Sequence, residues 1–185
     1  GLDDTTTNHV TSAYDIAIMS RELIKHDIIR KYSNVWQDEI RNGEFILTNT
    51  NRLVRYYQGC TGLKTGSTDK AGFCVSATAE RDGMHLITVI MGAPTRDERN
   101  NAARTLLDYG FASHAVYRDD AIPLERIPVK GGTPEEVTLF TNGFSCLVKK
   151  GEAAMIERTY VIPECLKGSY ASGDTVGEVI YTVEG

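Results

Sequence analysis

Residues Lys64-Thr65-Gly66 form the triplet whose chemistry best suits an anionic substrate. The lysine ammonium supplies a fixed positive charge and can help proton transfer at a serine nucleophile. The threonine adds a hydroxyl donor, and the glycine leaves room for a ligand to lie against the backbone of a strand. A tripeptide of common residues occurs by chance in a chain of this length with a probability on the order of a few per cent. The meaning of the triplet therefore depends on its surroundings.

Two arginines, Arg96 and Arg99, follow the run Met91-Gly92-Ala93 at the predicted start of a helix. A guanidinium fork binds a carboxylate better than the point charge of a lysine does. The dipole at the helix N-terminus favours the same anion. Both arginines are therefore candidates for binding a carboxylate, and the alternative is that they only lie on the helix surface, where arginine is common.

Apolar periodicity predicts two helices in the first part of the chain. The first runs from Ser12 to about residue 29, with Thr11 or Ser12 as its cap, and the second runs from a cap at Thr95 to about residue 111. The second helix is expected to bury one face, made of Ala102, Ala103, Leu106 and Leu107.

Short apolar runs bounded by turn residues predict the strands. Segments 35–40 and 44–47 are expected to pair around the turn Arg41-Asn42-Gly43. Segments 62–66, 73–80 and 84–91 are expected to form an antiparallel meander, whose last two strands are joined across Arg81-Asp82-Gly83. The triplet thus lies on a strand of an antiparallel sheet.

From about residue 118 the sequence pattern changes to short β-like runs separated by Gly, Pro and Asn. This pattern is typical of a small β-sandwich. The sequence therefore predicts two domains, 1–117 and 118–185. The fold class is α+β, an antiparallel sheet with flanking helices followed by a small all-β domain. We expect no catalytic residue in the second domain.

Several motifs together make the chain resemble the serine-type D-alanyl-D-alanine carboxypeptidases, the low-molecular-mass penicillin-binding proteins. The resemblance covers nearly all of the first 115 residues and rests on these segments: 11–15, 49–53, 62–68, 70–72, 89–93 and 106–111. It implies the C-terminal half of a β-lactamase/transpeptidase-like domain followed by a small β-rich domain.

The resemblance also implies roles for individual residues. Lys64 corresponds to the catalytic and substrate-binding lysine, Thr65 and Gly66 bind substrate, and the backbone N–H of Ser67 contributes to the oxyanion hole. Arg99 falls on the position that binds the substrate carboxylate. No metal and no cofactor is expected.

Two further motifs of the family, Ser-x-x-Lys and Ser-x-Asn, are expected upstream of the triplet. The 185 residues hold no Ser-x-Asn, and their one Ser-x-x-Lys, Ser67-Thr68-Asp69-Lys70, directly follows the triplet in a predicted turn. A nucleophile would need its lysine one helical turn away, so Ser67 is not expected to be the nucleophile. Tyr32-Ser33-Asn34 is interpreted as the end of a helix. We therefore expect the chain to be the C-terminal part of an enzyme, without activity by itself.

Composition narrows the remaining possibilities. The formal net charge is −5, which argues against nucleic acid as a partner. The sequence shows no signal peptide and no apolar run of 18 residues, so a membrane is expected only through other segments. The cysteines Cys60, Cys74, Cys146 and Cys165 lack metal-site spacing, and free thiols are the default, although Cys60 and Cys74 flank the triplet.

The complete protein is expected to remove the terminal D-Ala from peptidoglycan pentapeptide through a serine acyl-enzyme. Its expected ligands are peptidoglycan pentapeptide and β-lactams. Its expected partner is the missing N-terminal half, possibly as a separate chain. Its expected localisation is the bacterial cell envelope, outside the cytoplasm. Two alternatives stay open, a non-catalytic module of the same fold and a β-lactamase.

Overall fold

The computed structural model describes residues 8–183, which form two units. The first unit is Gly1–Ser113 and the second is His114–Gly185. The sequence placed a domain boundary after residue 117. The division between the two units falls before His114, which begins strand β6 (His114–Asp119), and β6 pairs with a strand of the second unit.

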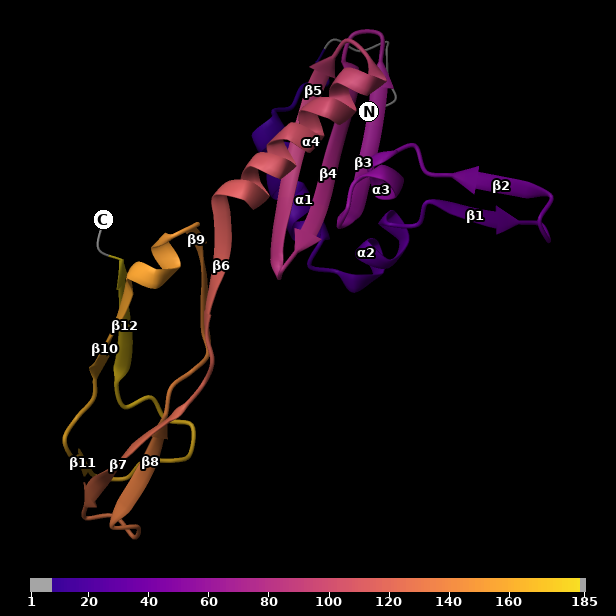
Figure 1. Cartoon of the computed structure of the whole chain (residues 1–185). Coiled ribbons are helices and arrows are strands. Elements are labelled where there is room, and N and C mark those ends of the chain that lie inside the picture. The colour runs from indigo at the N-terminus through magenta and orange to yellow at the C-terminus, as the bar shows by residue number, and fades with distance from the viewer. Residues whose placement is uncertain (1–7, 184–185) are drawn as a thin grey trace. The chain divides into compact units, whose positions relative to one another are not determined.

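A three-stranded antiparallel sheet forms the centre of the first unit (Figure 1). Its strands, in the order β3-β4-β5, are β3 (Cys60–Thr68), β4 (Gly72–Arg81) and β5 (Met84–Ala93). The link between β4 and β5 is the two-residue turn Asp82-Gly83, where both residues have positive φ, 51° and 73°. Such a turn matches the twist of a hairpin, and the expected meander is confirmed.

Helices cover both faces of this sheet. Successive residues of a strand point to opposite faces, and the buried run 75–79 of β4 is enclosed on both of them. On one face, Ser20 of α1 (Ala13–Leu23) hydrogen-bonds Ser76 with 2.6 Å between their hydroxyl oxygens. On the other face, Gly110 of α4 (Arg96–Ser113) lies so close to Leu86 that a Cβ atom would clash with it.

Helix α4 begins after Thr95, as predicted. The Thr95 hydroxyl accepts the backbone N–H of Glu98 at 3.1 Å and donates to the Glu98 carboxylate, which completes a cap. Its buried apolar residues are Ala103, Leu107 and Phe111. The prediction that Leu106 is buried was wrong, since 51% of it is exposed. The buried stripe repeats every four residues, which places Leu106 on the neighbouring face.

The predicted first helix is divided into α1 and α2 (Asp27–Ser33). Ser12 caps α1 in a capping box with Asp15. The break comes at His26, whose extended backbone precedes the first turn of α2. Ile24 and Ile29 are both partly buried, so the apolar pattern continues across the break and gave no sign of it.

The expected hairpin is present as β1 (Gln37–Ile40) and β2 (Phe45–Thr48), and it extends away from the sheet (Figure 1). All eight residues of its strands are exposed. The chain returns to the sheet through the short helix α3 (Leu53–Tyr56), and both α2 and α3 contact β3. Strand β3 is therefore held by elements that precede it in the chain.

The described part of the second unit, residues 114–183, is all-β apart from one 3₁₀ turn, η1 (Glu152–Met155). Its sheets pair β6 with β9, β10 with β12, and β7 with both β8 and β11. Asp119 joins two of these sheets, because it accepts hydrogen bonds from Arg158 on β10 and Tyr181 on β12. The remaining strands are β7 (Pro123–Lys130), β8 (Glu136–Phe140), β9 (Phe144–Lys149), β10 (Ile156–Val161), β11 (Leu166–Lys167) and β12 (Glu178–Val183).

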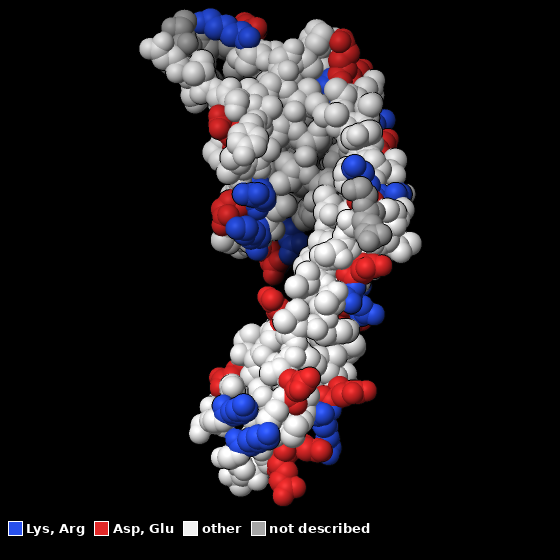
Figure 2. Space-filling model, turned by 90° about the vertical axis from the view of Figure 1, so that its left-hand side faces the viewer, with Lys and Arg blue, Asp and Glu red and all other residues white. Residues whose placement is uncertain are grey.

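Charged side chains of both signs are interspersed on the face drawn in Figure 2. Within residues 8–183, no helix combines the length and apolar character needed to cross a membrane. In the same part of the chain, no group of three or more His, Cys, Asp or Glu residues is arranged to hold a metal ion.

Candidate active site

The triplet lies on β3 at the edge of the described sheet, because β4 is the strand that pairs with it. Neighbouring side chains of a strand, such as Lys64 and Thr65, point to opposite faces. Lys64 and Ser67 are exposed, whereas Thr65 is buried, with 8% of its surface exposed. The Lys64 ammonium donates a hydrogen bond to the carbonyl of Thr65. An accessible positive charge therefore lies on an accessible strand edge.

The Thr65 hydroxyl points toward the protein and not toward solvent. Its Oγ1 lies 2.7 Å from Oγ1 of Thr50, which forms a hydrogen bond between the two hydroxyls. In this conformation the Thr65 hydroxyl is engaged within the protein, and the Thr65 carbonyl accepts the Lys64 ammonium.

The segment that ends in Thr50-Asn51 braces β3 through its side chains. The buried Asn51 amide donates to the carbonyl of Gly62 at 3.0 Å, and its oxygen accepts the backbone N–H of Leu53. Asn49 in turn accepts the backbone N–H of Asn51 at 2.9 Å. Sequence reasoning used this run only for the resemblance. Its density of asparagine and threonine, residues that often hydrogen-bond to nearby backbone, was the signal for a bracing role.

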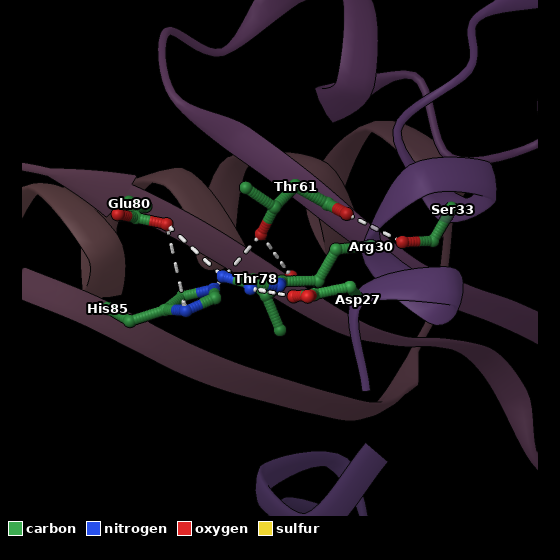
Figure 3. A network of polar contacts seen from close by, with 7 residues as sticks. All are labelled: Asp27, Arg30, Ser33, Thr61, Thr78, Glu80 and His85. Atoms are coloured by element: carbon green, nitrogen blue, oxygen red, sulfur yellow. Dashed lines mark hydrogen bonds and ion pairs between the residues drawn. The ribbon is translucent and has the colours of Figure 1, made fainter. Parts of the chain in front are cut away.

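A second set of polar contacts fixes the start of β3 to α2 and to the other strands (Figure 3). Ser33 donates to the carbonyl of Thr61 at 2.6 Å. The Thr61 hydroxyl contacts the Thr78 hydroxyl at 2.7 Å and Nε2 of His85 at 3.1 Å. Burial lowers the pKa of His85, although the nearby Glu80 carboxylate opposes this effect. The strand that carries the triplet is thus attached through both its backbone and its side chains.

Gly66 and the turn after β3 leave space beside the triplet. A Cβ atom on Gly66 would meet nothing within 4 Å, and its φ is not in the left-handed region. A cavity of about 510 Å³ lies next to it, lined by residues 67–73 and 92–94. Another cavity, of about 1000 Å³, lies within the second unit and contains none of the predicted site residues.

Arg99 lies in the first turns of α4 and is only 4% exposed. Its Nε and Nη2 donate to Oδ1 of Asn100 at 3.1 and 3.0 Å, and Nη1 lies 3.5 Å from the carbonyl oxygen of Cys74. Cys74 is the register partner of Gly66. The structure thus ties Arg99 to the strand next to the triplet.

The surroundings of Arg99 are positively charged. Burial lowers the pKa of Arg99 most, and the guanidinium groups of Arg96 and Arg52 lower it further, whereas Cys74 raises it. Arg96 itself is exposed, with its guanidinium carbon 5.8 Å from the ring centroid of Phe73, which lines the cavity beside the triplet. This arrangement suits a negatively charged ligand.

Ser67 lies on β3 and not at the start of a helix, and α2 ends at Ser33 as expected. All four cysteines are free. Cys60 and Cys74 do not face each other, because β3 and β4 place Cys60 opposite Ala79 and Cys74 opposite Gly66. Burial raises the pKa of the Cys60 thiol.

The structure is similar to solved penicillin-binding proteins. Penicillin-binding protein 5 from Haemophilus influenzae aligns with a TM-score of 0.72 and 26% identity over 95% of this chain and 52% of that chain. Penicillin-binding protein D2 from Listeria monocytogenes, solved in a cefotaxime-bound form, aligns with a TM-score of 0.55 and 32% identity over 60% of this chain and 45% of that one. These similarities define the class of fold.

The D-alanyl-D-alanine carboxypeptidase family matches residues 1–95, just over half of the chain. A curated relative, the D-alanyl-D-alanine carboxypeptidase DacF of Bacillus subtilis (strain 168), is 33% identical over 189 residues, which cover 98% of this chain and 48% of the relative. The chain therefore belongs to the D-alanyl-D-alanine carboxypeptidase family. It spans about half the length of the curated relatives it matches most fully.

Proposed function

We propose that the whole protein is a serine-type D-alanyl-D-alanine carboxypeptidase and that this chain supplies the substrate-binding edge of its active site. One observation carries the proposal, namely the exposed Lys64 ammonium beside the open Gly66 position on an edge strand, in a member of this family. An extended peptide could pair with such an edge through its backbone.

In the proposed reaction, a serine hydroxyl from upstream sequence attacks the carbonyl carbon of the D-Ala-D-Ala peptide bond. The C–N bond breaks, D-Ala leaves with a proton on its nitrogen, and water then hydrolyses the acyl ester. Lys64 stabilises the developing negative charge and helps proton transfer, while the backbone N–H of Ser67 donates to the oxyanion. Thr65 and Gly66 bind the peptide through their backbone.

Arg99 is proposed to attract the terminal carboxylate of the substrate. A buried guanidinium acts in a medium of low dielectric, so its field reaches a nearby anion with little screening. The positive charges of Arg52 and Arg96 act in the same direction. Arg99 thereby favours a peptide with a free C-terminus.

The proposed substrates and inhibitors are peptidoglycan pentapeptide and β-lactams, and the proposed place is the cell envelope, outside the cytoplasm and with a role in cell shape. The remaining half of the catalytic domain is the proposed partner of the first unit. Support comes from the solvent-facing side of α1, which exposes Tyr14 (74%), Ile18 (41%), Met19 (51%) and Leu23 (46%). A row of exposed apolar residues of this size is typical of an interface.

Acylation by a fluorescent penicillin tests the proposal. Lys64→Ala in the whole protein should slow acylation about 10²–10³-fold, the usual effect of removing one electrostatic contact to the oxyanion. Lys70→Ala is the matched control, because Lys70 is also an exposed lysine but ends the Ser67-Thr68-Asp69-Lys70 motif, which runs from β3 into the following turn; it should acylate like the wild type. Normal acylation of Lys64→Ala would contradict the role of Lys64, and loss of acylation in Lys70→Ala would favour Ser67-Thr68-Asp69-Lys70 as the reactive motif.

The same assay separates the alternatives. A β-lactamase would release hydrolysed penicillin rapidly and accumulate no adduct, whereas a non-catalytic module would form no adduct at all. The 185-residue chain by itself should gain no mass from penicillin, since the proposed nucleophile is not Ser67.

A further inference from the structure

Asn100 holds the guanidinium of Arg99 in an unusual way for a buried cation. Both residues are nearly inaccessible, with 7% of Asn100 and 4% of Arg99 exposed. The single oxygen Oδ1 of Asn100 accepts hydrogen bonds from both Nε and Nη2 of Arg99. Within residues 8–183, Arg99 forms no ion pair with a carboxylate, and its other contact is the carbonyl of Cys74. Neutral oxygens alone therefore accept its hydrogen bonds.

A buried charge without a counter-charge is costly. The cost is increased by the neighbouring Arg96 and Arg52 and by the positive end of the α4 dipole. An aspartate at position 100 would have nearly the same shape as the asparagine. Its carboxylate would form an ion pair with the Arg99 guanidinium and so offset this repulsion. The amide instead fixes the guanidinium and leaves its charge intact.

We propose that Asn100 is a positioning residue that orients Arg99 without neutralising it, so that the positive charge remains available to the terminal carboxylate of the substrate. The inference rests on the proposed function of Arg99. Specificity for peptides with a free C-terminus then depends on an uncharged side chain at position 100.

The test compares Asn100→Asp with Asn101→Asp in the whole protein. Both variants add one negative charge to the same turn of α4, but Asn101 is exposed and lies outside the contacts of Arg99. The substrates are two acylated D-Ala-D-Ala peptides that differ only in a terminal carboxylate or carboxamide. For Asn100→Asp, KM for the carboxylate peptide should rise about 10–100-fold, the usual strength of a hydrogen bond to a charged group. Its kcat and all values for the carboxamide peptide should stay near wild type, and Asn101→Asp should change neither peptide.

Binding of the same two peptides by calorimetry separates this inference from the proposed function, because it needs no turnover. If the wild type binds the carboxylate peptide preferentially and Asn100→Asp loses that preference, the inference stands even when no peptide is hydrolysed. An unchanged preference in Asn100→Asp, or an equal loss for both peptides, would overturn it.

A second variant keeps the test decisive if Asn100→Asp does not fold. Asn100→Ala removes the anchor but leaves the charge of Arg99, so binding of the carboxylate peptide should weaken while a preference over the carboxamide persists. If Asn100→Ala lost all preference for the carboxylate peptide over the carboxamide peptide, the charge of Arg99 would not be sufficient for that preference. This result would contradict the inference that residue 100 acts by leaving the charge intact.

Discussion

At the scale of single residues, Gly62 and Gly66 show how two glycines of one strand serve different purposes. Gly62 has a φ of +143°, and a Cβ atom there would lie 2.5 Å from the Ser33 hydroxyl oxygen. Gly66 has an ordinary backbone and open space. The first glycine allows α2 to approach β3, whereas the second keeps the strand accessible.

Gly62→Ala should therefore destabilise the protein by about 1–3 kcal/mol, since a side chain in this backbone region is strained and would also displace Ser33. Gly66→Ala should leave the free energy of unfolding almost unchanged but slow acylation by penicillin, because the methyl group occupies the ligand's side of the strand. Urea unfolding and acylation rates measure the two effects. A Gly66→Ala protein that acylates normally would contradict the role of Gly66 in ligand access. A Gly62→Ala protein as stable as the wild type would contradict the role of Gly62 in packing.

His85 predicts a pH dependence of stability. Its pKa is lowered in the folded protein by burial, so between about pH 6.5, the value of an unfolded histidine, and its folded pKa the unfolded chain binds more protons. Stability should therefore fall as the pH drops through this window and level off below the folded pKa.

His85→Gln can keep a hydrogen bond to Thr61 without titrating. In urea unfolding at about pH 7.5 and about pH 5.5, it should lose less stability on acidification than the wild type. Exposed His26→Gln is the control and should behave like the wild type. A His85→Gln protein with an unchanged pH dependence would show that burial of His85 does not oppose its protonation.

The sequence predicted features well where one local pattern dominated. Thr95 caps its helix as expected, because capping is a local rule. Lys64 lies on a strand of the expected antiparallel meander. The burial of the Thr65 hydroxyl against Thr50 and the contact of Asn100 with Arg99 were not predictable. They depend on how a loop folds over the strand and on which turn of a helix meets the sheet.

At the scale of elements, α4 shows the limit of periodicity. Leu106 and Leu107 are adjacent leucines, and the sequence placed both in the core. In the structure Leu107 is 1% exposed and Leu106 is 51% exposed. The direction of the helix axis over β4 and β5 decides between them, and no local pattern encodes that direction.

Leu107→Ala should lower the free energy of unfolding by about 2–5 kcal/mol, since it removes buried methyl groups and leaves a cavity. Leu106→Ala, the same substitution one residue earlier, should change it by no more than about 0.5 kcal/mol. Thermal or urea unfolding of the two variants measures the difference. Equal losses would mean that Leu106 is covered by another surface in solution.

At the scale of the whole molecule, the two units differ in the surfaces they expose. The first unit carries the apolar side of α1. The second unit joins two of its own sheets through Asp119 and Tyr181, where burial and a hydrogen bond to Asp119 raise the pKa of Tyr181 to about 12. We expect residues 114–185 to fold when expressed alone.

Residues 8–113, expressed alone, should associate with copies of themselves or require the other half of the catalytic domain. Ile18→Lys should weaken this association because it places a charge on the apolar side of α1, whereas exposed Arg21→Lys should not. Sedimentation over a range of concentrations gives the state of association. Strong amide protection of β4 and β5 in a dilute monomer, equal to that of the second unit, would contradict the expectation.

Trp36, the one tryptophan of the sequence, lies in the first unit just before β1. Its indole nitrogen is buried without a hydrogen-bond partner among the described residues, and Tyr56 approaches its ring edge-on at 6.0 Å between centroids. Tryptophan emission therefore follows the melting of the first unit alone, while circular dichroism records both. Melting curves from the two signals, measured on one sample, would show whether the units unfold together or in sequence.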